Sequence, residues 1–175
     1  MNRRRHKKLS RRLVDATLVG DIALVRAVLR AGAPAETADA AGTTPLYQAS
    51  VNGAADIVRV LLAAGASPDT ESGTGSEGTP LCGAACWGHT EAVRALLEHG
   101  ADPNLREDHG TGWAPLDWAS KGPYPETMDL LVAGGASMSF VKASLSGLGW
   151  FGVAGVMRRA RRLSVCGVRR RCRRG

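Results

Sequence analysis

The chain has 175 residues, is 44% apolar and carries a formal charge of +7, divided between an acidic middle and two basic ends. This length predicts one domain, and the scarcity of aromatic residues, with two Phe and two Tyr, predicts a core of alanine, leucine and valine in closely packed helices. The basic start runs into a stretch interrupted by Asp15, Asp21 and Arg26, which argues against a secretory signal and favours a cytoplasmic protein whose four cysteines remain thiols.

The first predicted elements are two helices within residues 13–32, separated at Gly20 and Asp21. Residues 1–12 precede them and are predicted to be a basic arm that need not pack against the helices. The pair lacks the Thr-Pro opening that begins each later segment. This difference is typical of a capping unit at the end of a repeated structure, whose outer face meets water.

The next predicted helix begins at Pro45. Thr44 stands where a side-chain oxygen can cap a helix, and Pro45 takes the first helical position, where a missing N–H costs nothing. The helix is expected to end near Gly53, because glycine readily leaves the right-handed region. A second helix is predicted after Asp56, and the glycine-rich run up to Gly78 leads to the following segment.

This order of signals recurs at an interval of 35 residues. Pro45, Pro80 and Pro115 are each followed by leucine and open a predicted helix. The second helix of the third segment is predicted around residues 91–97, and that of the fourth around residues 126–131. A period between about 20 and 50 residues is typical of a solenoid, in which each unit packs on its neighbours.

The repeated residues resemble the ankyrin repeat. The family pattern Gly-x-Thr-Pro-Leu-His-x-Ala-Ala-x-x-Gly-His, a second helix ending in Leu-Leu, and Gly-Ala-Asp-x-Asn are matched best over residues 78–104. The resemblance covers about residues 10–139 and implies an all-α ankyrin-repeat solenoid of about four helix–turn–helix units with hairpin-like connecting loops. The implied units are 10–39, 40–74, 75–109 and 110–139. The implied domains are a basic arm (1–12), the repeats (13–139), a degenerate C-terminal cap (140–157) and an arginine-rich tail (158–175).

Some positions depart from the family pattern. The connections from Gly65 to Pro80 and from Gly100 to Pro115 are two residues longer than the first one, so these two loops are expected to protrude. In the fourth unit, two prolines are expected to restrict where the second helix starts. The histidine of Thr-Pro-Leu-His is absent from all three units, which puts in question a hydrogen-bonding link typical of the family. Its replacements are Tyr47, Cys82 and Asp117.

The resemblance implies a protein that binds other proteins on its concave face and loop tips and has no chemistry of its own. The family's usual contact positions lie at the ends of the first helices and on the loops. The residues of this chain at those positions are Val51, Asn52, Cys86, Trp87, Ser120, Lys121, Ala41, Thr43, Ser76, Gly78, Thr111 and Trp113.

Two tryptophans stand out among these candidate contacts. Trp87 and Trp113 occupy positions expected to be exposed, and tryptophan is over-represented among binding hot spots. The alternative is that each ring covers a neighbouring repeat. Trp118 lies within a predicted helix, so packing in the core is favoured for it over contact with a partner.

Metal and catalytic sites find little support. Cys82, Cys86 and His89 share one predicted helix and its exit, but structural zinc usually takes four ligands, so the cysteines are better interpreted as small buried apolar residues. The glycine-rich run before Thr79 lacks the lysine and the preceding strand of a phosphate-binding loop. The sequence therefore predicts no enzyme activity, no cofactor, no metal and no small-molecule substrate.

The two basic ends support a second hypothesis. Residues 1–12 carry +7 and residues 141–175 carry +10, whereas residues 13–140 carry −10, with six basic residues against sixteen acidic ones. Such blocks are typical of solvated tails, of segments that contact polyanions, or of ends that lie against the acidic body of the same or another copy. The candidate polyanion-binding residues are Arg3, Arg4, Arg5, Lys7, Lys8, Arg158, Arg159, Arg161, Arg162, Arg169, Arg170 and Arg171.

The sequence thus favours a non-enzymatic adaptor that binds an unidentified protein partner through an ankyrin stack. The alternative is a protein that associates with nucleic acid or anionic membranes through its basic ends. The run before the last arginines, residues 143–157, is too short and glycine-rich for a membrane span. We expect residues 141–157 to cover the last repeat, with a membrane-surface segment or disorder as alternatives.

Overall fold

The computed structural model describes residues 3–73 and 77–137, which belong to the first of two compact units, Met1–Ser139. The predicted cap at 140–157 and the predicted tail at 158–175 lie outside the described residues. The elements in chain order are α1 (Arg3–Val19), α2 (Ile22–Arg30), α3 (Pro45–Val51), α4 (Ala55–Ala63), α5 (Pro80–Cys86), α6 (Thr90–Glu98), α7 (Glu107–Gly110), α8 (Pro115–Ala119) and α9 (Pro125–Ala133).

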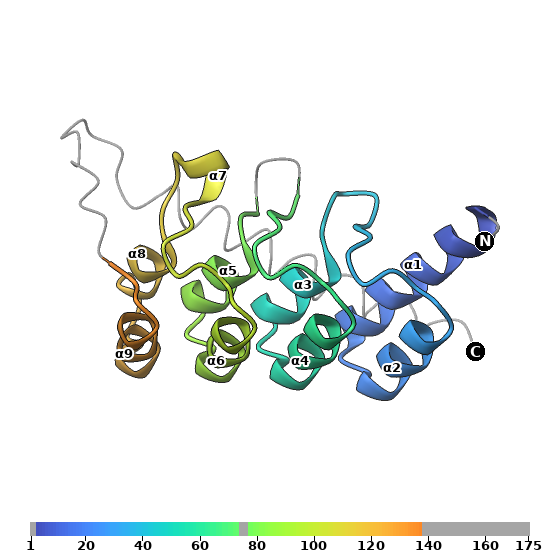
Figure 1. The fold of residues 1–175 in the computed structure, drawn as a ribbon, viewed down its shortest axis with the longest axis horizontal. Coiled ribbons are helices and arrows are strands. Elements are labelled where there is room, and N and C mark those ends of the chain that lie inside the picture. The colour runs from blue at the N-terminus through green and yellow to red at the C-terminus, as the bar shows by residue number, and fades with distance from the viewer. Residues whose placement is uncertain (1–2, 74–76, 138–175) are drawn as a thin grey trace, which may run out of the picture. The chain divides into compact units, whose positions relative to one another are not determined.

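The helices of this unit form pairs that stack side by side (Figure 1). Each pair consists of neighbours in sequence: α1 with α2, α3 with α4, α5 with α6, and α8 with α9. The first helices α1, α3, α5 and α8 contact one another in one row, and the second helices α2, α4, α6 and α9 in another. The predicted all-α stack of about four helix pairs is confirmed.

The predicted helix starts are also confirmed in the second and third units. Thr44 and Thr79 are extended N-cap residues, and their hydroxyl oxygens accept the backbone N–H of Tyr47 and Cys82, each at 3.2 Å. Proline follows at the first helical position of both helices. The last helix α9 likewise begins at a proline, Pro125, in agreement with the restriction expected there.

The beginning of the chain differs from the predicted arm. Helix α1 starts at Arg3, ten residues before the predicted start at Leu13. Leu9 and Ser10 are buried, because they lie one turn before Leu13 and two turns before Ala16 on the side of α1 that faces the stack. Residues 3–12, predicted as part of a separate basic arm, are therefore the first turns of the first helix, whereas the predicted break at Gly20 and Asp21 is confirmed.

The core consists of leucine, valine and alanine, as the composition predicts. Leu61, Leu96 and Leu131 are fully buried in successive second helices. Alanines in the first helices, such as Ala49 and Ala84, have no exposed surface. Small side chains let neighbouring helices approach closely, which is why a stack of such short helices has a continuous core.

The junctions between units depend on the turn glycines. Gly53 and Gly88 follow the first helices α3 and α5 and have positive φ angles of 67° and 68°. The ring of His89 lies directly against Gly53, and its Nε2 donates to the carbonyl oxygen of Val51 at 3.0 Å. The ring of Tyr124 lies against Gly88 in the same way. Each ring therefore fills the space above the turn of the preceding unit.

Three connecting loops project from the same side of the stack, beside the first-helix row (Figure 1). The loop before α8 contains α7, a tight turn in which Asp108 and His109 have positive φ angles of 50° and 54°. None of the described helices is both long enough and apolar enough to cross a membrane.

Candidate partner-binding surface

Aromatic and charged side chains gather where the loop with α7 meets α8. The rings of Trp113 and Trp118 have centroids 4.9 Å apart and are tilted by 56°. The Nζ of Lys121 lies 4.6 Å from the centroid of the Trp113 ring. A cation over an indole face is attracted by the quadrupole of the ring. We call Trp113, Trp118, Lys121 and the adjoining Glu107 the Trp113 cluster.

Glu107 links α8 of the fourth unit to the loop that precedes α5 in the third unit. Its Oε2 accepts the indole N–H of Trp118 at 2.8 Å, and its carboxyl group lies against Gly78 in the preceding loop. Burial raises the pKa of Glu107 to about 7, while the hydrogen bonds from Trp118 and Cys82 oppose the rise and the nearby charges of Asp108 and Glu71 add to it. Glu107 is therefore a half-buried carboxyl group that titrates near neutral pH.

Bonds to the preceding loop hold the α7 turn in place. The carboxylate of Glu71 accepts the backbone N–H of His109 at 3.0 Å, and its other oxygen lies 3.1 Å from His109 Nδ1. Arg106 Nε donates to the carbonyl oxygen of Gly112 at 2.8 Å across the base of the same loop. These contacts stabilise the left-handed residues, which are unfavourable for side chains other than glycine.

A second network fixes the loop between α4 and α5 and changes the interpretation of two predicted contacts. The family pattern predicts Thr43 as a loop contact, but it is 8% exposed, and its hydroxyl donates to Glu77 Oε1 at 2.8 Å. Ser72 donates to the other oxygen of Glu77 at 2.9 Å and accepts the N–H of Thr44 at 2.8 Å. Gly78 is also covered, by Glu107. Thr43 thus bonds to the following loop, and Gly78 lies against the carboxyl group of Glu107.

The two cysteines of α5 differ in burial: Cys82 is buried and Cys86 is half-buried. Cys82 occupies the position where the family pattern has a histidine. Its thiol donates to the carbonyl oxygen of Trp113 at 3.7 Å, which links α5 to the following loop. Burial, with a smaller contribution from Glu107, raises the pKa of Cys82 well above its ordinary value and that of Cys86 to about 11. Neutral thiols are poor nucleophiles and poor metal ligands. In the part of the chain that the structure describes, no three His, Cys, Asp or Glu side chains are grouped to hold a metal.

The remaining predicted contacts differ in how far they are exposed. Trp87 caps the end of α5 and is half-buried, as are Cys86, Val51 and Trp113. Ser76 lies outside the described residues. The exposed candidates are Asn52, Ser120 and Lys121 at the ends of first helices and Ala41 and Thr111 on the loops.

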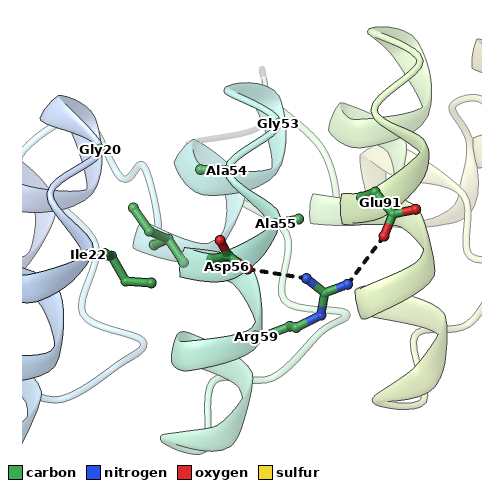
Figure 2. A pocket seen from close by; sticks show the side chains of 9 residues that line it. Gly20, Ile22, Gly53, Ala54, Ala55, Asp56, Arg59 and Glu91 are labelled. Atoms are coloured by element: carbon green, nitrogen blue, oxygen red, sulfur yellow. Dashed lines mark hydrogen bonds and ion pairs between the residues drawn. The ribbon is translucent and has the colours of Figure 1, made fainter.

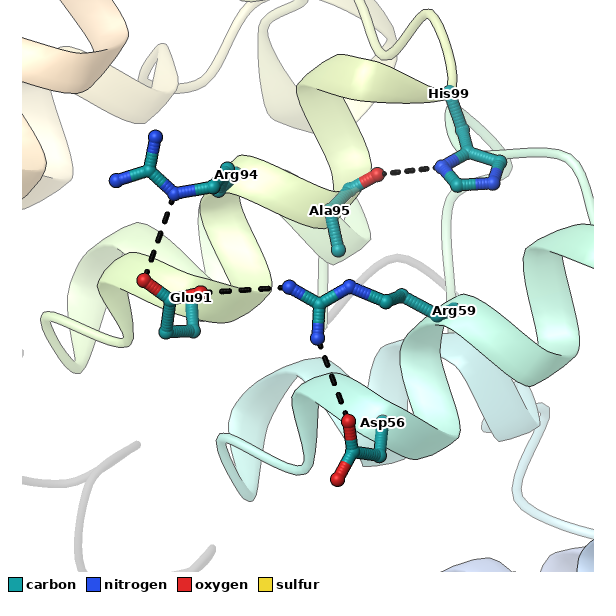
Figure 3. Close-up of polar contacts among 6 residues, drawn as sticks. All are labelled: Asp56, Arg59, Glu91, Arg94, Ala95 and His99. Carbon is teal, nitrogen blue, oxygen red and sulfur yellow. Dashed lines mark hydrogen bonds and ion pairs between the residues drawn. The ribbon is translucent and has the colours of Figure 1, made fainter.

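A pocket of about 420 Å³ lies elsewhere, where the turn between α1 and α2 meets the start of α4 (Figure 2). Gly20 and Ile22 line it from the first unit, and Ala54 and Asp56 from the second. Figure 3 shows the ion pairs beside it: Arg59 bridges Asp56 and Glu91, each at 3.4 Å. Asp56 and Glu91 are largely exposed and Arg59 is 39% exposed, so each pair contributes at most about 1 kcal/mol to stability.

The described candidates for polyanion binding lie on α1. Arg4, Arg5, Lys7 and Lys8 are exposed on this helix. For Arg3 only the backbone is described, and the candidates from Arg158 to Arg171 lie outside the described residues. The basic side chains of α1 are therefore presented by a helix that packs on the repeats through Leu9 and Leu13.

Stacked helix pairs joined by loops define a helical repeat protein. One family model, the ankyrin repeat, matches residues 41–72, and a second, of three copies of the ankyrin repeat, matches residues 69–141. Together they span residues 41–141, more than half of the chain, and the chain belongs to the ankyrin repeat family. No curated protein matches the chain. Ankyrin repeats are typically protein–protein interaction modules and usually non-catalytic.

Sequence reasoning missed the part that Glu107 plays in this surface. The sequence pattern predicted Trp113 and Lys121 as separate contacts with a partner protein, and it predicted that Trp118 packs in the core. Trp118 does pack against the core, but its indole N–H also holds Glu107. The only signal in the sequence was an acidic residue in a lengthened loop, which by itself does not indicate burial.

Proposed function

We propose that the chain is a non-enzymatic adaptor that binds a protein partner through the concave face and loop tips of its repeats. The Trp113 cluster carries this proposal. The half-buried indole of Trp113, with Lys121 over its face, offers a large apolar area, and tryptophan is enriched among the residues that dominate binding. The free thiols of Cys82 and Cys86 fit the cytoplasmic location that we propose with it.

The partner would contact residues from two neighbouring units. Trp87 and Cys86 end α5, and Trp113, Ser120 and Lys121 flank α8, whose packing against α5 supports one continuous surface. Asn52 and Val51 at the end of α3 would extend the surface by one unit. The exposed loop residues Ala41 and Thr111 would lie at its edge.

Replacing both Trp87 and Trp113 by alanine tests this proposal. An affinity pull-down with the wild-type chain identifies partners, and titration calorimetry then measures their affinity. We expect the double variant to bind at least about 30-fold more weakly, because a hot-spot residue contributes about 2 kcal/mol or more. The matched control is Val132→Ala, which removes a 57%-exposed apolar side chain from α9 and should leave the affinity unchanged.

The thermal unfolding of both variants must be measured as well, because Trp113 packs against Trp118. A folded double variant that keeps the wild-type affinity for every captured partner would contradict the proposal. Equal losses of affinity in the double variant and in Val132→Ala would show a general effect on the stack and would also contradict it.

A specific feature of α1 supports a second candidate function, the binding of nucleic acid or anionic membranes. The first turn of α1 contains arginines at positions 3, 4 and 5 and no acidic residue. Positive charge at a helix N-terminus opposes the helix dipole and costs about 0.3–1 kcal/mol for each charge. Residues that break a local stability rule are often functional, and a cluster of arginine and lysine is the chemistry that neutralises phosphates.

Salt dependence tests this second function. We expect the full chain to bind duplex DNA, RNA or anionic vesicles with an affinity that falls steeply as salt increases. Replacing Arg4, Arg5, Lys7 and Lys8 by glutamine should weaken binding and lower the slope of log K against log salt by about one for each phosphate that is no longer neutralised. Replacing Arg26 and Arg30 on α2 by glutamine removes exposed charge from another helix and is the control. An unchanged slope in the α1 variant would exclude α1 as the binding element.

A further inference from the structure

The residue before each second helix decides what fills the junction between units. Asp21, Ala54, His89 and Tyr124 are the N-cap residues of α2, α4, α6 and α9. In the later junctions this residue is a ring: His89 lies on Gly53, and Tyr124 lies on Gly88. His89 also donates a hydrogen bond to Val51, two residues before the turn glycine.

The first junction lacks such a ring. Gly20 stands in the first unit where Gly53 stands in the second, since both have positive φ angles and follow the first helix of their unit. The residue of the next unit at this junction is Ala54, and no atom from outside the turn lies within 4 Å of the position that a β-carbon on Gly20 would take. The pocket of about 420 Å³ in Figure 2 includes this place, with Gly20 and Ala54 in its lining, and extends along the start of α4 to Gly53 and Glu91.

The lining of this pocket suits a neutral ring with one polar atom. Ile22 and Ala55 add apolar surface to that of Gly20 and Ala54. The charged side chains at its rim are already paired, because Arg59 bridges Asp56 and Glu91 and Arg94 also binds Glu91. A charged group would have to compete with these pairs, whereas a neutral ring would not.

We propose that this pocket binds a histidine or tyrosine side chain of a partner protein, in the place that His89 and Tyr124 take at the later junctions. The proposal rests on the adaptor function proposed above. The ring would pack on Gly20, Ile22 and Ala54. Its N–H or O–H group would donate to the carbonyl oxygen of Leu18, two residues before Gly20. His89 donates in the same way to the carbonyl oxygen of Val51, two residues before Gly53. This contact region lies at the turns between paired helices, apart from the Trp113 cluster.

Capped tripeptides test this pocket without any knowledge of the partner. The probes are acetyl-Gly-His-Gly-amide at pH 8, where imidazole is neutral, and acetyl-Gly-Tyr-Gly-amide, with the Phe and Ala tripeptides as controls. We expect both probes to cause saturable shifts of the backbone amide resonances of Gly20, Ile22 and Ala54. The Phe peptide, which lacks the donor, should bind at least about tenfold more weakly, and the Ala peptide should not bind.

A variant that fills the pocket from within provides the matched control. Ala54→His places in the second unit the residue that the third unit has at position 89, so we expect a raised Tm and at least about tenfold weaker probe binding. His89→Ala should open an equivalent site at Gly53 and show new shifts there with the His probe.

The proposal is overturned if no probe causes saturable shifts at Gly20, or if the Ala peptide binds as well as the His and Tyr peptides. Undiminished binding to a folded Ala54→His variant would also overturn it, since the probe would then bind elsewhere. These results do not depend on Trp87 or Trp113, so failure here and failure of the adaptor surface are distinguishable.

Discussion

Replacing Glu107 by glutamine is expected to make the repeat unit more stable at pH 8 and to remove one component of its pH dependence. The folded-state pKa of Glu107, about 7, lies above the ordinary value of 4.5 because the carboxyl group is largely buried. A carboxyl group with a raised pKa holds its proton more tightly in the folded than in the unfolded state. Its contribution to stability is therefore full below about pH 4.5 and is lost as the pH rises to about 7.

Glutamine stays neutral at every pH and keeps an oxygen that can accept the indole N–H of Trp118. For a fully buried carboxyl group, a rise in pKa from 4.5 to about 7 would correspond to about 3 kcal/mol of stability lost at pH 8. Because Glu107 keeps some contact with solvent, screening reduces the expected gain to about 1–2 kcal/mol at pH 8, with little difference between the variant and the wild type near pH 5. The measurement is urea unfolding of both proteins at several values between pH 5 and 8.

Comparing the two proteins at each pH cancels the titration of the groups that they share. Glu98→Gln, which removes an exposed carboxylate from α6, is the matched control, and its difference from the wild type should stay constant over the same range. A constant difference for Glu107→Gln as well would show that the carboxyl group of Glu107 is not desolvated in the folded protein.

Gly88→Ala is expected to destabilise the fold by about 2–5 kcal/mol. Gly88 has a φ angle of 68°, where a residue with a β-carbon costs about 1–2 kcal/mol. The added methyl group would also meet the ring of Tyr124. In the chain, Tyr124 stands between Pro123 and Pro125, whose fixed φ angles limit how far its backbone can move. Crowding of the methyl group against the ring therefore adds about 1–3 kcal/mol.

Gly20→Ala is the matched control, because Gly20 has the same role in the first unit and a φ angle of 79° but no neighbouring atom within 4 Å of the new methyl group. We expect it to cost only about 1–2 kcal/mol, the backbone part alone. Thermal or urea unfolding of both variants measures the difference. Combining Gly88→Ala with Tyr124→Ala should cost less than the sum of the two single variants. Equal effects of Gly20→Ala and Gly88→Ala would show that the ring does not fill the junction.

The repeat architecture was predictable because its signals are local. A threonine before a proline caps a helix through atoms only three residues apart, and a turn glycine is selected by its own φ angle. Repetition of these signals at one interval then identified the stack and its family. The amino-acid sequence therefore determined the helix pairs, most of their boundaries and the candidate contacts at their ends.

Tertiary structure decided which of those candidates are accessible and what surrounds them. Thr43 is buried because Glu77, 34 residues later, accepts its hydroxyl hydrogen. Burial between two loops raises the pKa of Glu107 to about 7, and this effect outweighs the hydrogen bond from Trp118, which lowers it. The space beside Gly20 is open where residue 54 is an alanine, whereas the rings of His89 and Tyr124 fill the corresponding places at Gly53 and Gly88. Helical and turn preferences belong to single residues and their neighbours, whereas burial, pKa and open volume depend on side chains that meet only when one unit packs on the next.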